Sequence, residues 1–312
     1  MDEFNIIKKF FVKPSVRDDV ALGSGDDCAL VNVPSGQQVA ITTDTLVSGV
    51  HFPVDTAPFD IGFKALAVNL SDLAAMGATP AWVTGALTLP SVDKDWLAEF
   101  ARGLFAVANK YKVQLIGGDM TKGPLTITLQ AMGLVPTGSA LIRSGAKVGD
   151  LIYVSNVVGD AGLALQFLTK KIVVAPEWQS QILTRFNQPE PRVHLGEQLR
   201  GVASAAIDIS DGLAADLRHI LEKSKVGARI YVDKLPLSAA LKNSVDVKLA
   251  IELALTAGDD YELCFTVPKE KCSLLPTDNV TCIGEIISDE QMIFQFTDGS
   301  KYHGDTSGYQ HF

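Results

Sequence analysis

The segment Ile41–Phe52 reads Ile-Thr-Thr-Asp-Thr-Leu-Val-Ser-Gly-Val-His-Phe and joins a short strand pattern to a loop. Alternation of side chains over residues 39–43 predicts the strand, and Gly49 is the flexible point of the loop. The strand end presents hydroxyl and carboxylate oxygens, which suit Mg²⁺ better than zinc or copper. His51 follows Asp44 in the loop, where an imidazole could reach a small anion. The segment therefore predicts a magnesium and anion site at a strand end.

Composition and charge limit the partners. The chain has 312 residues and a formal net charge of −9. This length favours two α/β lobes over one. The negative charge argues against nucleic acid or an anionic membrane as the main partner. The first residues lack the apolar core of a signal peptide, no later run could span a bilayer, and the four cysteines form no Cys-x-x-Cys pair. We therefore expect a cytoplasmic protein with reduced thiols.

Three further acidic segments precede or follow the first one in the N-terminal half. Gly23–Asp27 places paired acids after glycines, although for this segment alone a plain turn between strands is the favoured interpretation. A helix is predicted over 60–76, and it carries Asp72 in its final turns, where the negative helix end disfavours a lone carboxylate. Gly117–Asp119 follows a predicted buried strand over 113–116, a common way to display a metal ligand.

The C-terminal half holds two more acidic corners. A buried strand over 203–209 emerges as Asp208–Gly212, Asp-Ile-Ser-Asp-Gly, and a helix is predicted to begin there. A strand, two acids around a serine and a helix N-terminus predict a corner for phosphate and metal. Gly258–Glu262 is the last acidic corner. Arg143, at the predicted boundary between the lobes, offers a planar fork for phosphate oxygens, or else a surface ion pair.

The remaining patterns predict alternating helices and strands. They are an amphipathic helix over 2–11, helices over 93–110, 160–169 and up to 199, and strands over 28–33, 125–135, 151–155, 263–267, 280–287 and 292–296. The strand over 125–135 alternates cleanly, and an edge of that kind could pair across a homodimer. We expect an N-terminal domain over 1–140 and a C-terminal α/β domain over 141–312. The aromatic tail, 308–312, is expected to pack back onto the body.

In family order, seven of these stretches resemble the thiamine-monophosphate kinases. They are Gly25–Ala29, Thr42–Asp44 with Gly49–Phe52, Lys64–Ala78, Gly117–Asp119, Arg143–Gly145, Asp208–Leu213 and Asp259–Leu263. Any one of them is weak, whereas seven in order over nearly the whole chain are specific.

The resemblance implies ATP-dependent phosphorylation of thiamine monophosphate to thiamine diphosphate. It also implies the fold of the aminoimidazole ribonucleotide and selenophosphate synthetases, in which the N-terminal sheet pairs across a dimer. Several Mg²⁺ ions would be held by Asp27, Thr42, Thr43, Asp44, Asp72, Asp119, Asp208 and Asp211. ATP would contact Gly118, Asp119, Arg143 and Ser210, and thiamine monophosphate would contact His51, Glu262 and Tyr309. Ala101 stands where members often carry an aromatic that contacts adenine, and Tyr309 stands where tryptophan is frequent.

Electrostatics agrees with the resemblance. Two carboxylates about 4 Å apart repel by roughly 4 kcal/mol at an effective dielectric constant near 20, so converging acids require cations. Two alternatives remain open. One is a sister enzyme of the same fold that makes aminoimidazole ribonucleotide or selenophosphate, although residues 1–23 lack the cysteine expected of a selenophosphate enzyme. A relative of the hydrogenase-maturation proteins would need a C-terminal cysteine, and this chain ends in Gln-His-Phe. The other is a non-catalytic regulator that binds nucleotide or metal.

Overall fold

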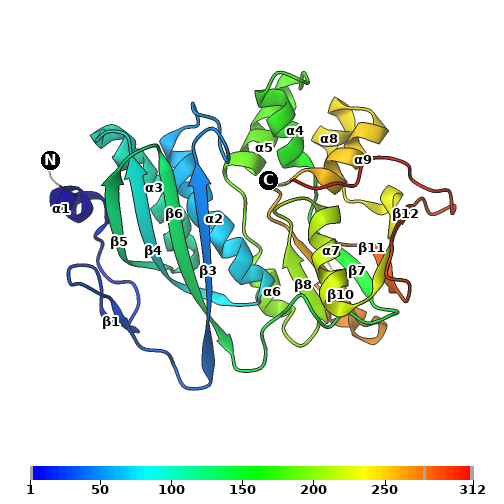
Figure 1. Ribbon diagram of the computed structural model, residues 1–312, viewed down its shortest axis with the longest axis horizontal. Helices are drawn as coiled ribbons and strands as arrows, with labels where there is room; N and C mark the ends of the chain where they lie inside the picture. The colour runs from blue at the N-terminus through cyan, green and yellow to red at the C-terminus, as the bar shows by residue number, and fades with distance from the viewer. Residues whose placement is uncertain (1–2, 277–278, 310–312) are drawn as a thin grey trace. The chain divides into compact units, whose positions relative to one another are not determined.

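The protein is described by a computed structural model covering residues 3–276 and 279–309. The expected helix start at Asp2 and the tail positions 310–312 lie outside these residues. The chain forms two compact units, Met1–Leu73 with Ala78–Gly138 and Ala74–Gly77 with Ser139–Phe312 (Figure 1). No helix in the described part of the chain is long and apolar enough to cross a membrane.

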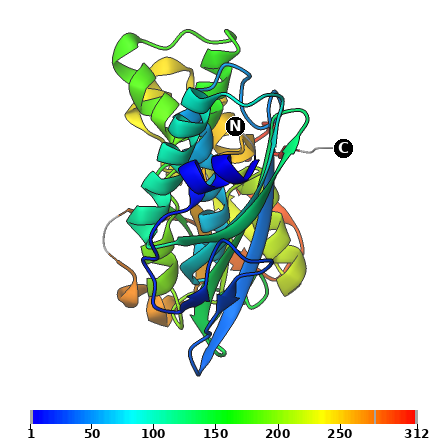
Figure 2. The ribbon, with the colours of Figure 1, turned by 90° about the vertical axis from the view of Figure 1, so that its left-hand side faces the viewer.

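The N-terminal unit is built on a four-stranded sheet of order β3-β6-β4-β5. Its strands are β3 (Gln37–Val47), β4 (Thr79–Leu89), β5 (Gln114–Lys122) and β6 (Thr126–Pro136). β4 and β5 are parallel, and the other pairs are antiparallel. Helices α2 (Pro58–Ala75) and α3 (Lys94–Tyr111) cover one face, as Figures 1 and 2 both show. These two helices confirm the predictions over 60–76 and 93–110.

Two glycines allow α2 and α3 to approach closely. A Cβ at Gly62 would lie 2.1 Å from the carbonyl oxygen of Phe100, and a Cβ at Gly103 would lie 1.9 Å from that of Phe59. Each glycine therefore faces the backbone of the other helix, and neither position has room for a methyl group. Phe100 and Leu104 are held against the sheet at this crossing, with exposed fractions of 0% and 2%.

Gly103→Ala is expected to destabilise the N-terminal unit by about 2–4 kcal/mol, because overpacking against backbone cannot be relieved by a rotamer change. At an exposed helix position the same change would stabilise by about 1 kcal/mol. The control is Ala98→Gly, at an exposed position of α3, which should cost only about 1 kcal/mol. Urea unfolding measures both. A Gly103→Ala midpoint at or above that of the wild type would refute the close crossing.

The opposite face of the sheet is only partly covered. A hairpin of β1 (Val20–Leu22) and β2 (Leu30–Val31) packs there, and a small second core forms around Ala81, Trp82 and Ile116. The rest of this face carries exposed positions of β3, such as Ile41 with 61% exposure. The N-terminal segment is α1 (Glu3–Ile6), followed by one π-helical turn, η1 (Ile7–Phe11).

The C-terminal unit contains a six-stranded sheet of order β12-β9-β11-β7-β10-β8. The strands are β7 (Leu151–Ser155), β8 (Ala205–Asp208), β9 (Gly227–Tyr231), β10 (Leu263–Val267), β11 (Val280–Ile287) and β12 (Met292–Gln295). All pairs are antiparallel except β12 with β9. The helices are α4 (Asp160–Leu168), α5 (Pro176–Asn187), α6 (Val193–Gln198), α7 (Leu213–Ser224), α8 (Ala239–Ser244) and α9 (Val247–Thr256), with 3₁₀ turns at Val232–Lys234 and Lys269–Leu274.

Two details of the predicted strands are wrong. Asp44 does not end its strand, because β3 runs on to Val47. The pair Gly117–Gly118 does not end the predicted strand over 113–116 either, because β5 continues through it to Lys122. A Cβ at Gly118 would lie 2.1 Å from the carbonyl oxygen of Gly85 on β4. The glycine here serves close strand packing rather than a turn.

Candidate active site

Three predicted ligands of the N-terminal unit meet between β3 and α2. Thr42 and Asp44 pair across the sheet with Ala131 and Leu129, which are buried under the helices, so their side chains lie on the helix-covered face. There the hydroxyl of Thr42 donates a hydrogen bond to Asp72 of α2. Burial and the nearby charge of Asp72 raise the pKa of Asp44 to about 7. Two carboxylates that resist simultaneous ionisation are the expected signature of a cation site.

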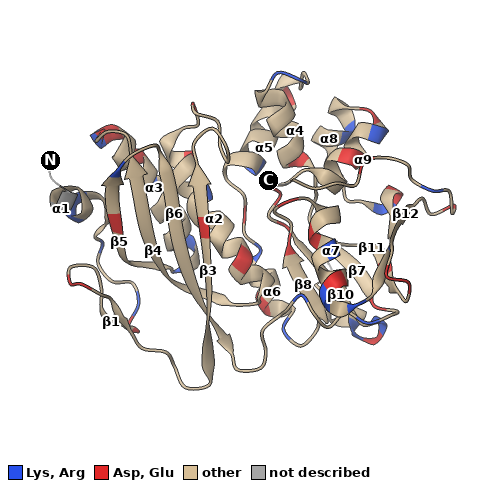
Figure 3. Cartoon of the chain, viewed as in Figure 1, with Lys and Arg blue, Asp and Glu red and all other residues tan. Residues whose placement is uncertain are grey.

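Thr43 and Asp119 lie on the other face of the same sheet. Thr43 pairs with Gln130, whose amide donates to the Thr43 hydroxyl over 3.3 Å. Asp119 pairs with Ala86 and lies in a row that continues through Thr128 to Thr45. The side chain of Thr43 therefore points away from Asp44, and only its backbone carbonyl could join that site. Figure 3 marks the acidic positions on β3, β5 and α2 in red.

A pocket of about 440 Å³ lies beside β5 in the N-terminal unit. Its walls are apolar side chains of α3, η1 and the sheet, and its polar groups come from two glycine-acid segments; they include Phe11, Phe100, Leu104, Leu129, Gly25, Asp26, Asp27, Gly117, Gly118 and Asp119. Gly118 brings bare backbone to the pocket. A mostly apolar pocket with a few polar groups on one side is typical of a binding site for a small molecule.

His51 is fixed by the loop that follows β3. Its backbone N–H donates to the carbonyl of Val47, and its Nδ1 accepts from the backbone N–H of Val47, each over 3.0 Å. Because Nδ1 is an acceptor, the neutral ring carries its proton on Nε2, which makes that nitrogen a donor. The half-buried imidazole is thus oriented before any ligand binds.

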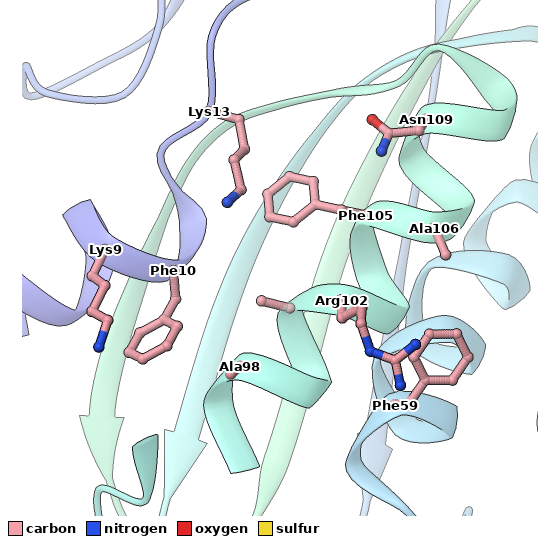
Figure 4. Close-up of a pocket in the computed structure, with 10 residues that line it drawn as sticks. Lys9, Phe10, Lys13, Phe59, Ala98, Arg102, Phe105, Ala106 and Asn109 are labelled. Atoms are coloured by element: carbon pink, nitrogen blue, oxygen red, sulfur yellow. The ribbon is translucent and has the colours of Figure 1, made fainter. Parts of the chain in front are cut away.

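Ala101 lies in a different pocket from Gly118 and Asp119. The helix face that carries it borders a surface pocket of about 590 Å³ next to η1, shown in Figure 4. There the guanidinium of Arg102 lies 4.1 Å from the centre of the Phe59 ring, and the ammonium of Lys13 lies 5.3 Å from that of Phe105. Phe100 and Leu104, one position before and three after Ala101, line the 440 Å³ pocket instead.

In the C-terminal unit, Asp208 ends β8, and Ser210 and Asp211 lie in the turn between β8 and α7. Asp208 is the buried last residue of β8. The next backbone N–H groups, those of Ser210, Asp211 and Gly212, all donate to one oxygen of Asp216, over 3.0, 3.0 and 3.1 Å. Burial raises the pKa of Asp216 to about 7. The three backbone N–H groups at this corner are therefore hydrogen-bonded to the chain's own carboxylate.

Two other predicted segments contact the same turn through backbone hydrogen bonds. The N–H of Asp259 donates to the carbonyl of Ser210, and the N–H of Tyr309 donates to that of Asp211, each over 2.9 Å. The C-terminal segment thus returns to the body as expected, and the Tyr309 side chain is half exposed. Arg143 is exposed in the segment before β7.

Glu262 is fully buried and pairs with two arginines. Its carboxylate accepts from Arg185 over 2.7 Å and from Arg192 over 2.6 and 2.7 Å. The hydroxyl of Ser155 donates over 2.5 Å and the amide of Asn156 over 3.2 Å. Glu262, predicted to contact substrate, is thus the centre of a polar network. Its partners Arg185 and Arg192 are partly exposed at the surface.

Sequence inspection missed Asp216, Arg185 and Arg192. Asp216 had a weak signal, an acid four residues after the glycine that opens a helix. The arginines had none, because they lie 77 and 70 positions from Glu262 and no periodic pattern links them.

Within residues 3–276 and 279–309, no three His, Cys, Asp or Glu side chains lie close enough to hold a metal ion. The donor chemistry nevertheless fits Mg²⁺. Asp44, Asp72 and Thr42 present hard oxygens on one face of the sheet, and these are the ligands that Mg²⁺ prefers.

Comparison with known proteins places the chain in a class. Residues 25–135 match the N-terminal domain of the AIR synthase related proteins, and residues 147–296 match the C-terminal domain. The chain is thus an α/β protein of the AIR synthase-like fold.

Individual relatives narrow the class. The thiamine-monophosphate kinase of Salmonella typhimurium is 49% identical, over 99% of this chain and 98% of that protein. The crystal structure of the thiamine-monophosphate kinase from Stenotrophomonas maltophilia superposes with a TM-score of 0.85 at 45% identity, covering 92% of this chain and 93% of that one. AaThiL complexed with AMPPCP and TMP has a TM-score of 0.81 at 31% identity, covering 99% and 96%. This chain belongs to the thiamine-monophosphate kinase family.

Proposed function

We propose that the protein transfers the γ-phosphoryl group of ATP to thiamine monophosphate, forming thiamine diphosphate and ADP. The observation that carries this proposal is the 49% identity with a thiamine-monophosphate kinase over 99% of the chain. The complex of AaThiL with AMPPCP and TMP supports the choice of both substrates. The apolar pocket beside Gly118 and Asp119 is suited to the nucleotide.

We propose that the residues predicted from the sequence bind Mg²⁺, ATP and thiamine monophosphate. Mg²⁺ would be held by Asp27, Thr42, Thr43, Asp44, Asp72, Asp119, Asp208 and Asp211; ATP by Gly118, Asp119, Arg143 and Ser210; and thiamine monophosphate by His51, Glu262 and Tyr309. Mg²⁺ would neutralise the charge of the phosphates. Thr43 would take part through its carbonyl, and Glu262 would act through Arg185 and Arg192. His51 would donate from Nε2 to an anionic oxygen.

Transfer is proposed to be direct, without a phosphorylated enzyme. A phosphate oxygen is already an anion at neutral pH, so the acceptor needs no general base. Positioning the two phosphates in line is sufficient, and a covalent relay would add a step without benefit. Direct transfer inverts the configuration at the moving phosphorus, and ATP made chiral at that atom reports it. Retention would contradict direct transfer.

The function is tested by measuring ADP release with a coupled assay. The purified protein should release ADP with thiamine monophosphate and Mg²⁺, and should not do so with thiamine or without an acceptor. ADP release that is independent of thiamine monophosphate would contradict the proposal.

A homodimer is proposed through the uncovered face of the N-terminal sheet. The prediction that the strand over 125–135 is a sheet edge is wrong, because β6 lies between β3 and β4. Its apolar side chains Ile127 and Leu129 are buried within their own unit, so they are not the pairing surface. The opposite face offers Ile41 together with Thr45 and Thr128, whose hydroxyls lie 2.9 Å apart and are exposed. A contact there would cover this surface.

Light scattering should give twice the 33.4 kDa of one chain at micromolar concentration. Thr45→Glu, which introduces a charge on this face, should shift the protein toward monomer, whereas Thr137→Glu, at another exposed position, should not. A wild-type monomer would refute the proposed dimer. We further propose a cytoplasmic location, since all four cysteines are free thiols.

A further inference from the structure

The backbone between β8 and α7 converges on one carboxylate oxygen. Three successive N–H groups, from Ser210, Asp211 and Gly212, reach the same oxygen of Asp216 within 3.0–3.1 Å. Successive N–H groups that point inward form a concavity that binds anions. Here the anion is supplied by α7 itself, one turn further along the chain, and the Asp216 side chain is buried with 3% exposure.

The carbonyl side of the same turn is fixed as well. Ser210 and Asp211 accept from Asp259 and Tyr309, each over 2.9 Å. The two segments pack closely against the turn, since a Cβ at Gly258 would lie 2.3 Å from the Ser210 carbonyl oxygen and a Cβ at Gly308 would lie 2.8 Å from that of Asp211. The turn is thus held by Asp216 on its donor side and by two distant segments on its acceptor side.

We propose that Asp216 is a positioning residue, which holds the turn so that the side chains of Ser210 and Asp211 project toward the phosphates and their metal ions. This inference rests on the proposed function. In this proposal, Asp216 acts through the three N–H groups that donate to it and has no direct contact with substrate or metal. If the Asp216 oxygen is removed, the three N–H groups of the turn lose their acceptor. The side chains of Ser210 and Asp211 are then no longer held in the orientation that ligand binding requires.

Geometry and charge can be separated at this position. Asp216→Asn keeps a carbonyl oxygen at the same reach, and one oxygen is enough for all three hydrogen bonds. Asp216→Glu keeps the charge but moves the oxygens by one methylene into a buried space. Asp216→Ala removes the acceptor. If geometry is what matters, Asn should behave like the wild type, and Glu should behave like Ala.

Amide hydrogen exchange tests the contact without reference to activity. In the protein without substrates, the amides of Ser210, Asp211 and Gly212 should exchange at least about tenfold faster in Asp216→Ala and Asp216→Glu than in the wild type or Asp216→Asn. The control is Asp246→Ala, which removes the acceptor that caps α9 (2.8 Å to the N–H of Leu249). It should leave these three amides unchanged. Equal exchange in the wild type, Asp216→Glu and Asp216→Ala would overturn the proposal.

Kinetics tests the consequence. Asp216→Glu and Asp216→Ala should lower kcat at least about tenfold, because misplacement by a fraction of an ångström is costly in phosphoryl transfer. They should also raise the Mg²⁺ concentration needed for half-maximal rate, whereas Asp216→Asn should stay within about threefold of the wild type. If Asp216→Ala does not fold, the comparison of the other two variants still tests the proposal, which predicts a higher kcat for Asp216→Asn than for Asp216→Glu. Glu above Asn would show that charge matters and would overturn the proposal. A wild type without kinase activity would refute the proposed function, and the exchange rates alone would then decide whether Asp216 positions the turn.

Discussion

Asp44→Asn is expected to lower turnover by at least about a hundredfold while the protein stays folded, because it removes metal-binding charge at the moving phosphoryl group. The same substitution should make the metal-free protein more stable at pH 8. Burial and Asp72 raise the pKa of Asp44 from 3.8 to about 7 in the folded protein. Ionised Asp44 therefore destabilises the folded protein, and a neutral asparagine at this position does not.

The pH dependence of this effect has a definite sign. Because the pKa is higher in the folded than in the unfolded protein, the folded state binds the proton more tightly. Metal-free wild type should lose stability as the pH rises from about 4 to about 7, by up to roughly 4 kcal/mol. The stability gain of Asp44→Asn should be largest above pH 7 and should shrink as the pH falls toward 4.

Thermal unfolding in EDTA at several pH values measures this gain. Added Mg²⁺ should stabilise the wild type and have little effect on the variant. The matched control is Asp93→Asn on the exposed N-cap of α3, where the amide oxygen can still accept from the N–H groups of Asp95 and Trp96. It should change neither turnover nor melting. Near-normal turnover of Asp44→Asn, or equal melting of variant and wild type at pH 8 in EDTA, would contradict the metal assignment.

Glu262→Ala is expected to destabilise the C-terminal unit by about 3–5 kcal/mol, because it removes the buried carboxylate that both Arg185 and Arg192 contact. Arg185 and Arg192 have side-chain exposures of 16% and 18%, and both bind the fully buried carboxylate. Without it, Arg192 keeps its pair with the exposed Glu190 over 3.3 Å and Arg185 keeps its hydrogen bond to the Val157 carbonyl over 3.3 Å, but the buried carboxylate that balanced both cations is gone. A residue that served only to touch substrate would leave stability unchanged.

The control is Glu285→Ala, which breaks the pair with Arg229 across 2.7 Å, where the side chains are 28% and 35% exposed. An ion pair of that exposure contributes about 1 kcal/mol or less. Urea unfolding of the two variants compares a buried with a partly exposed pair of the same chemistry. Similar midpoints for the two variants would show that the buried network is not the main role of Glu262.

Helices with a regular apolar stripe could be predicted from the sequence. The predictions over 60–76 and 93–110 agree with α2 and α3 within two residues. The short helices α8 and α9 were missed, although Ser238 and Asp246 stand at their N-caps and accept from Leu241 and Leu249. Those capping residues were the available signal.

The site was harder to predict than the fold. The pattern around Asp44 identified hard oxygen ligands. However, β3 continues past Asp44, and successive side chains of a strand point to opposite faces of the sheet. Thr43 and Asp44 therefore lie on different faces. The pair Gly117–Gly118 indicated a strand end because glycine weakens strands. The actual reason for a glycine at position 118 is the close contact with Gly85 on β4. That contact depends on the pairing of β4 with β5, which the sequence does not show. Asp216 and the arginines around Glu262 are contacts of the folded chain.

The proposed transfer from ATP to thiamine monophosphate is tested most directly by following the phosphoryl group itself. ATP labelled with ¹⁸O at its γ-phosphoryl oxygens is incubated with thiamine monophosphate and the purified protein, and the products are analysed by mass spectrometry. We expect one labelled thiamine diphosphate for each ADP, with the label on the terminal phosphate, and no product in EDTA. ADP that forms without labelled thiamine diphosphate, or the same yield in EDTA as in Mg²⁺, would contradict the proposed transfer.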